Sequence, residues 1–305
     1  MPFPSQTIHS THLKLMSFYP KVTILGVGLM GGSIGLALRQ RGLAEEIVGI
    51  GRRQASLDKA LACGVISHAT LDLEAGVRQA DLVIICTPVA AIVDDVRRVL
   101  AATESPGVHS KTTRTETLVT DIGSTKSAIC LQTTSTEGVQ RFVGSHPLAG
   151  DHRSGPDNAL ADLFVKKTVV LTPTASTATE TTSNIQEFWQ ALGAKVVQMA
   201  PAEHDQALAS TSHLPHLVAS ALAATTPEKW LSLAATGWSD TTRIAAGDPE
   251  LWAQIFVQNT PDLLSALDRL IAELGKMRAS LATEDWKQTQ DSLTRAKRIR
   301  DALGN

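Results

Sequence analysis

The sequence predicts an α/β fold in two parts: a doubly wound parallel sheet, followed by an all-helical C-terminal part. Short β-branched runs alternate with helical stretches up to about residue 199, and glycines follow the first run directly. After Pro201 the chain consists mainly of alanine, leucine and other helix formers. Short apolar strands separated by helices are typical of a parallel sheet covered on both faces. We therefore divide the chain into an extension (1–19), an α/β domain (20–199) and a helical domain (200–305).

The pattern of apolar residues predicts where the individual elements lie. Strands are expected at 22–25, 47–50, 81–86, 117–121, 142–144, 168–171 and 195–199. Helices are expected after the first glycine-rich turn and at 55–62, 89–102, 205–225, 249–258, 261–283 and 286–302. The segment 104–116 is rich in Ser, Thr, Lys and Pro, which predicts a solvated loop.

The composition argues against a disordered chain, a nucleic-acid-binding protein and a membrane-spanning protein. Hydrophobic residues make up 43% and charged residues 19% of 305 residues, which is typical of a folded chain with a sizeable core. The net charge of −2 gives no basic excess for nucleic acid or an anionic membrane, and no apolar run is long enough to span a bilayer. The three cysteines form no CxxC motif, so we expect reduced thiols in a cytoplasmic protein.

The N-terminal extension reads as a disordered tail. Residues 1–19 are polar and lack the apolar region of a secretory signal. Met16 lies just ahead of the first expected strand, and it is an alternative start to Met1.

The segment Gly26-Val27-Gly28-Leu29-Met30-Gly31 matches the pattern GxGxxG. It follows a predicted strand and opens a predicted helix, the context that a dinucleotide-binding loop requires. The first glycine permits a tight turn, the second lets the backbone approach a pyrophosphate, and the third lets helix and strand pack closely. The free N–H groups of the helix N-terminus then attract the phosphates. The alternative is that these glycines only form a turn.

The end of the second strand favours NADP over NAD. An acidic residue about 20 positions beyond the glycine motif would bind the ribose 2′-hydroxyl of NAD. Here the chain has Gly51-Arg52-Arg53, two guanidiniums that can pair with a 2′-phosphate. Alternatively, Arg52 and Arg53 are surface charges and both cofactors are accepted. Thr87 and Pro88, which end the third strand, are further cofactor-binding candidates.

His146 and Ser124 are the candidate catalytic residues. Both lie just after predicted strands, at the edge where open α/β sheets place their ligands. A histidine there can act as a base near neutral pH, and a serine hydroxyl can bind a substrate oxygen or orient the imidazole. Ser124 is alternatively the N-cap of a helix.

The helical half contributes three further candidates. His213 and His216 are three residues apart and share a helix face. They lack a third ligand at a convincing spacing, so we expect no metal site; they are either satisfied core histidines or substrate-facing. Arg243 lies among apolar and small residues, where burial requires a carboxylate partner, either a ligand or an internal residue such as Asp240.

Five segments together resemble the prephenate/arogenate dehydrogenase family of tyrosine biosynthesis. They are residues 26–35, 121–126, 144–150, 212–216 and 242–245, the last followed by Asp248-Pro249 and Trp252. The resemblance implies a Rossmann-like domain followed by a helical domain that forms a homodimer. It implies oxidative decarboxylation of prephenate or arogenate, with hydride transfer to NADP or NAD. Because the chain ends at Asn305, we expect it to lack the extra regulatory domain of some relatives.

The resemblance also assigns roles. His146 is the base that binds the hydroxyl, with Ser124 beside it. Arg243 binds a substrate carboxylate, and Asp240 holds the guanidinium of Arg243. Arg243 and His146 converge on the ring of the substrate. His213 and His216 line the pocket, and Trp252 is taken as core. Many relatives have glutamate where this chain has His152.

The loop after Gly150 leaves the substrate open, because Asp151 suits the ammonium of arogenate and Arg153 argues against it.

Two other functions compete with this interpretation. One is another two-domain dehydrogenase of the β-hydroxyacid or imine reductase type, which would use different groups on its helical domain. The other is a non-catalytic nucleotide sensor, which would need none of Ser124, His146 and Arg243.

Overall fold

The computed structural model describes residues 19–103, 116–150 and 153–304. The chain divides into two compact units. The first contains Met1–Asp205 and Gly247–Gln258, and the second contains Gln206–Ala246 and Asn259–Asn305. Within the described ranges, no helix has the length and apolar character needed to cross a membrane.

The first unit is built on a sheet of 8 strands in the order β3-β2-β1-β4-β5-β6-β7-β8. The strands are β1 Tyr19–Leu25, β2 Ala44–Ile50, β3 His68–Thr70, β4 Leu82–Ile85, β5 Leu118–Asp121, β6 Phe142–Pro147, β7 Thr168–Thr172 and β8 Lys195–Gln198. Strands β1 to β6 are parallel to one another. The strand order reverses between β1 and β4, the switch point at which ligands bind in open α/β sheets.

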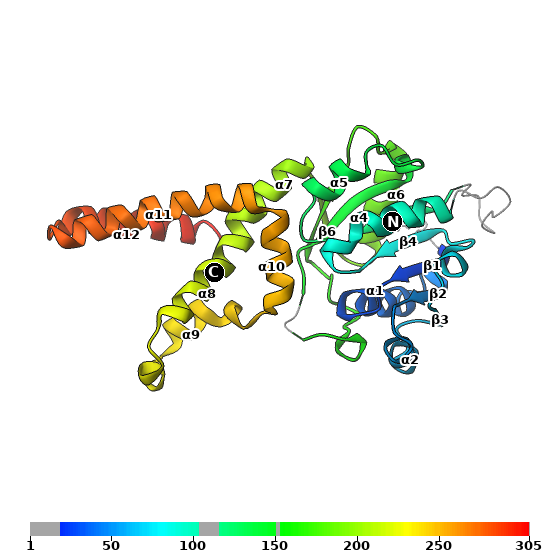
Figure 1. The fold of residues 1–305 in the computed structure, drawn as a ribbon, viewed down its shortest axis with the longest axis horizontal. Helices are drawn as coiled ribbons and strands as arrows, with labels where there is room; N and C mark the ends of the chain where they lie inside the picture. The colour runs from blue at the N-terminus through cyan, green and yellow to red at the C-terminus, as the bar shows by residue number, and fades with distance from the viewer. Residues whose placement is uncertain (1–18, 104–115, 151–152, 305) are drawn as a thin grey trace, which may run out of the picture. The chain divides into compact units, whose positions relative to one another are not determined.

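Helices cover both faces of this sheet (Figure 1). One face packs against α1 Leu29–Gln40, α2 Gln54–Ala62 and α6 Thr179–Ala191. The other packs against α3 Leu73–Val77, α4 Ile92–Ala102 and α5 Ser127–Thr133, and also against α10 Pro249–Gln258. The predicted doubly wound sheet is therefore confirmed.

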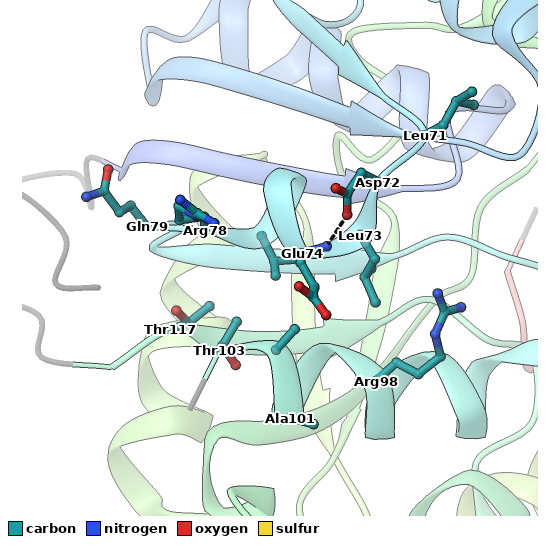
Figure 2. A pocket seen from close by; sticks show the side chains of 12 residues that line it. Leu71, Asp72, Leu73, Glu74, Arg78, Gln79, Arg98, Ala101, Thr103 and Thr117 are labelled. Carbon is teal, nitrogen blue, oxygen red and sulfur yellow. Dashed lines mark hydrogen bonds between the residues drawn. The ribbon is translucent and has the colours of Figure 1, made fainter. Parts of the chain in front are cut away.

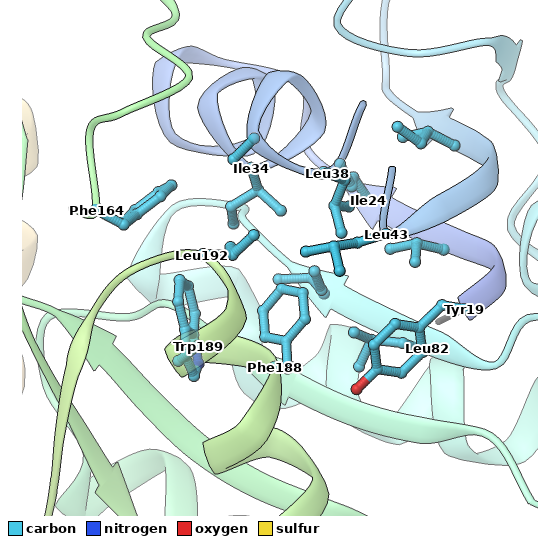
Figure 3. Close-up of a cluster of buried hydrophobic side chains, with 14 of the residues drawn as sticks. Tyr19, Ile24, Ile34, Leu38, Leu43, Leu82, Phe164, Phe188, Trp189 and Leu192 are labelled. Atoms are coloured by element: carbon cyan, nitrogen blue, oxygen red, sulfur yellow. The ribbon is translucent and has the colours of Figure 1, made fainter. Parts of the chain in front are cut away.

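The larger apolar core lies between the sheet and α1, α2 and α6 (Figure 3). Its aromatic centre is Trp189, fully buried, which contacts Phe188 and Phe164 edge to face. Aromatic side chains bury a large apolar area, and this drives α6 onto the sheet.

The predicted helical character after Pro201 is also confirmed. α7 Pro201–Leu208 leads into a π-helical turn, Ala209–His213, and then α8 Leu214–Thr225. Pro215 lies in the first turn of α8 and has no N–H for the carbonyl four residues earlier, which accounts for the widened turn. α9 Thr236–Thr242, α11 Thr260–Ala282 and α12 Trp286–Asp301 complete the helices, joined by short 3-10 turns at Glu228–Leu233 and Arg243–Ala246.

Three features differ from the sequence-based prediction. The strand expected at 142–144 extends to Pro147, because β7 pairs antiparallel with Gly144 through Pro147. The last two strands, β7 and β8, therefore run against the first six. The helices α5, α6 and α9 and the short elements β3 and α3 were not predicted from the apolar pattern. The expected disordered extension and the loop at 104–116 lie almost entirely outside the described residues.

Candidate active site

The glycine loop has the geometry that a dinucleotide requires. Gly26 adopts a φ of +99°, which L side chains rarely tolerate, and turns the chain sharply out of β1. A Cβ on Gly31 would overlap the carbonyl oxygen of Gly26, whereas a Cβ on Gly28 would meet nothing within 4 Å. Gly28 is the N-cap residue of α1, followed by the buried Leu29 and the half-buried Met30. Of these three glycines, Gly28 alone has open space where a Cβ would lie.

The ends of β2 and β4 lie on either side of β1. After β2 come Gly51, Arg52 and Arg53, and both arginines are exposed, Arg53 as the N-cap residue of α2. After β4 come Cys86, Thr87 and Pro88, with Thr87 half-buried and its hydroxyl 2.7 Å from Asp95 Oδ2. The segments that follow β2, β1 and β4 therefore lie side by side along one edge of the sheet.

A buried carboxylate organises the end of β5. Asp121 forms an ion pair with Lys126, and both side chains are fully buried. Its Oδ2 also accepts the N–H of Gly123 at 2.7 Å, and its Oδ1 accepts the N–H of Ser145 at 3.2 Å. Asp121 thereby fixes the loop after β5 and joins it to β6.

His146 lies within β6, opposite Val170 of β7, and not after the strand as the sequence suggested. Its Nδ1 is 2.8 Å from Nε2 of His204, at the start of α7. Nδ1 of His204 is in turn 2.7 Å from Oδ1 of Asp205. His204 and Asp205 are buried, at 0% and 1% exposure, whereas His146 is half-buried.

The carboxylate of Asp205 also holds the loop that carries Ser124. It accepts the N–H of Lys126 and of Ser127, each at 2.8 Å. Burial alone would raise the pKa of Asp205, but the hydrogen bonds from His204 and these two backbone groups outweigh it and hold the pKa below its ordinary value. Asp205 is therefore ionised at neutral pH.

Ser124 is half-buried in a bend between β5 and α5. The alternative reading of Ser124 as a helix N-cap is wrong, because α5 begins at Ser127 and its N-cap residue is Lys126. The Asp205 carboxylate accepts hydrogen bonds from the backbone N–H groups at the start of this helix. The side chain of Ser124 is not needed for capping.

The second unit holds His213, His216 and Arg243. His213 is buried in the π-helical turn, with Nδ1 3.1 Å from the side-chain amide of Asn259. Burial lowers the pKa of His216, so its ring is neutral at pH 7. In the ranges that the structure describes, no group of three His, Cys, Asp or Glu could hold a metal ion.

The structure corrects the expectation for Arg243. Arg243 and Asp240 are both exposed, and no ion pair joins them in the described part of the chain. Because its guanidinium is solvated, Arg243 does not need an internal partner. Trp252, taken as core, does pack against the apolar cluster of the first unit and contacts Phe256. Asp151 and His152 lie outside the described residues.

A surface pocket lies apart from these groups (Figure 2). It is lined by α3, the end of α4 and Thr117, with Asp72 capping α3 through the N–H of Glu74. None of its lining residues belongs to the glycine loop or to the His146 cluster. We therefore do not assign it to the active site.

Sequence reasoning missed His204 and Asp205. Both stand in Pro201-Ala202-Glu203-His204-Asp205, the first turn and a half of the first helix after the last strand. Two adjacent titratable residues that become buried at a helix start are a signal, but only burial distinguishes them from ordinary surface residues.

Two family models match this chain. The sequence matches the family described as prephenate dehydrogenase, nucleotide-binding domain, over residues 34–198. It matches the prephenate dehydrogenase dimerization domain over residues 200–295.

Individual relatives are similar over nearly the whole chain. A cyclohexadienyl dehydrogenase of Zymomonas mobilis is 31% identical, over 94% of this chain and 97% of the relative. A prephenate dehydrogenase of Bacillus subtilis is 33% identical, over 92% of this chain and 76% of the relative. The structure of Aquifex aeolicus prephenate dehydrogenase in complex with hydroxyphenyl propionate and NAD⁺ superposes with a TM-score of 0.83 at 30% identity, covering 93% of this chain and 98% of that one.

The glycine loop yields a matched pair of variants. Gly31→Ala is expected to lower the free energy of unfolding by about 1–3 kcal/mol, because the added methyl must displace backbone. Gly28→Ala is expected to leave it nearly unchanged while weakening dinucleotide binding. Urea unfolding and fluorescence titration with NADPH measure the two effects. A stable Gly31→Ala variant would contradict the close approach.

The Asp121–Lys126 pair yields a second prediction. Lys126→Met leaves a buried carboxylate without its cation and is expected to destabilise the fold by about 3–5 kcal/mol. Adding Asp121→Asn is expected to restore part of that loss, as measured by urea unfolding. Lys59→Met serves as the control, because the Lys59–Asp157 pair is exposed and its loss should leave stability nearly unchanged. A double variant less stable than Lys126→Met would contradict this account.

Proposed function

The chain belongs to the prephenate dehydrogenase family, and from this premise we propose that it oxidatively decarboxylates prephenate or arogenate in tyrosine biosynthesis. The observation that supports this most directly is the position of His146 in β6. In the sheet, β5 separates β6 from β4, and β4 pairs with β1, the strand that leads into the glycine loop. The carboxyl ends of β1, β4 and β5 meet at one edge of the sheet, with His146 near the end of β6. A base and a cofactor site thus share one surface.

The reaction needs a proton acceptor at the C4 hydroxyl of the cyclohexadienol. We assign this task to His146: the O–H bond breaks and an N–H bond forms on the imidazole. A nicotinamide held by the glycine loop and the residues after β2 and β4 would supply the acceptor for the hydride at C4. The bond to the ring carboxylate then breaks, CO₂ leaves, and its electron pair completes the aromatic ring. Ser124 is proposed to bind the same hydroxyl, as its half-buried position in the loop after β5 permits.

Substrate binding is assigned to the second unit. The exposed guanidinium of Arg243 suits a carboxylate ligand, which it can bind through two parallel hydrogen bonds. His213 and His216 are proposed to line the pocket, and the neutral ring of His216 favours contact with the apolar part of the substrate. Asp151 and His152 are kept as candidate contacts to the substrate side chain.

The protein is proposed to act as a homodimer through its helical part. On α11, Leu264, Ile271, Leu274 and Leu281 follow a helical spacing, and each is more than half exposed. Such a stripe is expected to be covered by another apolar surface. The match to a dimerization domain supports a second copy of this chain as its partner.

A spectrophotometric assay with prephenate and arogenate against NAD and NADP tests the activity. His146→Asn is expected to lower kcat by about 10²- to 10⁴-fold and to leave cofactor affinity nearly unchanged, because only proton transfer is lost. Cofactor binding without turnover of either substrate would instead favour a nucleotide sensor. Unchanged kcat in the variant would remove His146 from the mechanism.

Preference for NADP is a separate proposal. It is supported by exposed Arg52 and Arg53 at the end of β2, where an NAD-specific site would have an acid. Arg52→Ala is expected to raise the KM for NADP by about 10- to 100-fold, since a charge-assisted hydrogen bond contributes about 1.5–3 kcal/mol. The KM for NAD is the internal control. Equal changes for both cofactors would refute the 2′-phosphate contact.

A further inference from the structure

When both imidazoles are neutral, the hydrogen bonds among His146, His204 and Asp205 fit one arrangement of protons. The carboxylate of Asp205 can only accept, and it already accepts two backbone N–H groups. Nδ1 of His204, 2.7 Å from that carboxylate, must therefore carry a hydrogen. A neutral His204 then has its lone pair on Nε2.

This lone pair determines the tautomer of His146. Nε2 of His204 is 2.8 Å from Nδ1 of His146, so one of the two nitrogens must donate. Since Nε2 of His204 is the acceptor, Nδ1 of His146 carries the hydrogen. The lone pair of His146 is then on Nε2, the opposite corner of its ring.

We propose that His204 and Asp205 are positioning residues that hold His146 in the Nδ1–H tautomer, with Nε2 ready to accept a proton. The proposal rests on the proposed function, since it takes His146 as the base for the substrate hydroxyl. When Nε2 takes that proton, His146 becomes an imidazolium whose Nδ1–H still donates to His204. The anionic Asp205 stabilises the new charge through His204, across two hydrogen bonds.

The burial of His204 and Asp205 suits them to this role. His204 and Asp205 are almost completely excluded from water, so the interaction of the carboxylate with a developing cation is screened only weakly. The hydrogen bonds from Lys126 and Ser127 fix the carboxylate, so it needs little rearrangement during the reaction. A histidine ring without such partners would populate both tautomers, and only one of them has its lone pair on Nε2.

The tautomer can be measured without any assay of activity. In the full-length protein labelled with ¹⁵N-histidine, the signals of His146 are identified by their loss in His146→Asn. At a pH where the ring is neutral, Nδ1 is expected to resonate as a protonated nitrogen and Nε2 as an unprotonated one. A protonated Nε2 in the neutral wild-type ring would overturn the proposal.

The variant His204→Phe keeps a ring at this position but removes the acceptor. It is expected to move the Nε2 signal of His146 toward the protonated position. It is also expected to lower kcat at least about tenfold, with little change in the KM for the dinucleotide. Ile185→Ala, at a buried position on α6 outside the cluster, provides a comparison that is destabilised but keeps the relay.

The outcomes separate this inference from the proposed function. An equal loss of kcat in Ile185→Ala and His204→Phe at a similar loss of Tm would reduce His204 to a structural role and overturn the inference. A wild-type protein with the expected tautomer but no turnover of prephenate or arogenate would refute the function while confirming the proton arrangement.

Discussion

The carboxylate of Asp205 is the group on which the surroundings of His146 depend. It receives the backbone N–H groups of Lys126 and Ser127, and so ties the start of α7 to the loop after β5. The same carboxylate accepts from His204, which contacts His146. An unpartnered buried carboxylate would take up a proton, whereas one with several N–H donors remains an anion. Its charge therefore fixes the backbone and also acts on the imidazole.

Asp121 and Asp205 are both buried beside the loop after β5, but different groups interact with their negative charges. Asp121 is paired with the ammonium of Lys126, and the pair holds the loop between β5 and α5 in place. The hydrogen bonds described for Asp205 come from backbone amides and a histidine. A proton that arrives on the imidazoles therefore lies close to the negative charge of Asp205. The family's chemistry, with hydride transfer assigned to the cofactor, requires such a proton acceptor.

Local sequence patterns predicted the strands of the first unit other than β3, the glycine loop and the position of His146 near a strand end, because each depends on neighbours in the chain. The extension of β6 to Pro147 could not be predicted, because it depends on β7 returning antiparallel from more than 20 residues away. The His204–Asp205 pair depends on the same tertiary arrangement. Ser124 carried a plausible capping signal, but the carboxylate of Asp205 serves that helix start from a distant segment. The exposure of Arg243 could not be predicted, because its neighbours in the sequence are mostly apolar or small.

Helix α10 comes late in the chain but belongs to the first unit. Ile255, Trp252 and Phe256 pack against the cluster that includes Val89 and Ile92, and Gln258 accepts a hydrogen bond from Thr125 at 2.6 Å. The polypeptide consequently leaves the nucleotide-binding unit, returns to it and leaves again. A gene fragment that stopped after Asp205 would encode the 8 strands that the structure describes. Its product would leave part of an apolar surface uncovered and would be prone to self-association. Each of the two units of this enzyme is compact in space, but neither is encoded by one continuous stretch of the gene.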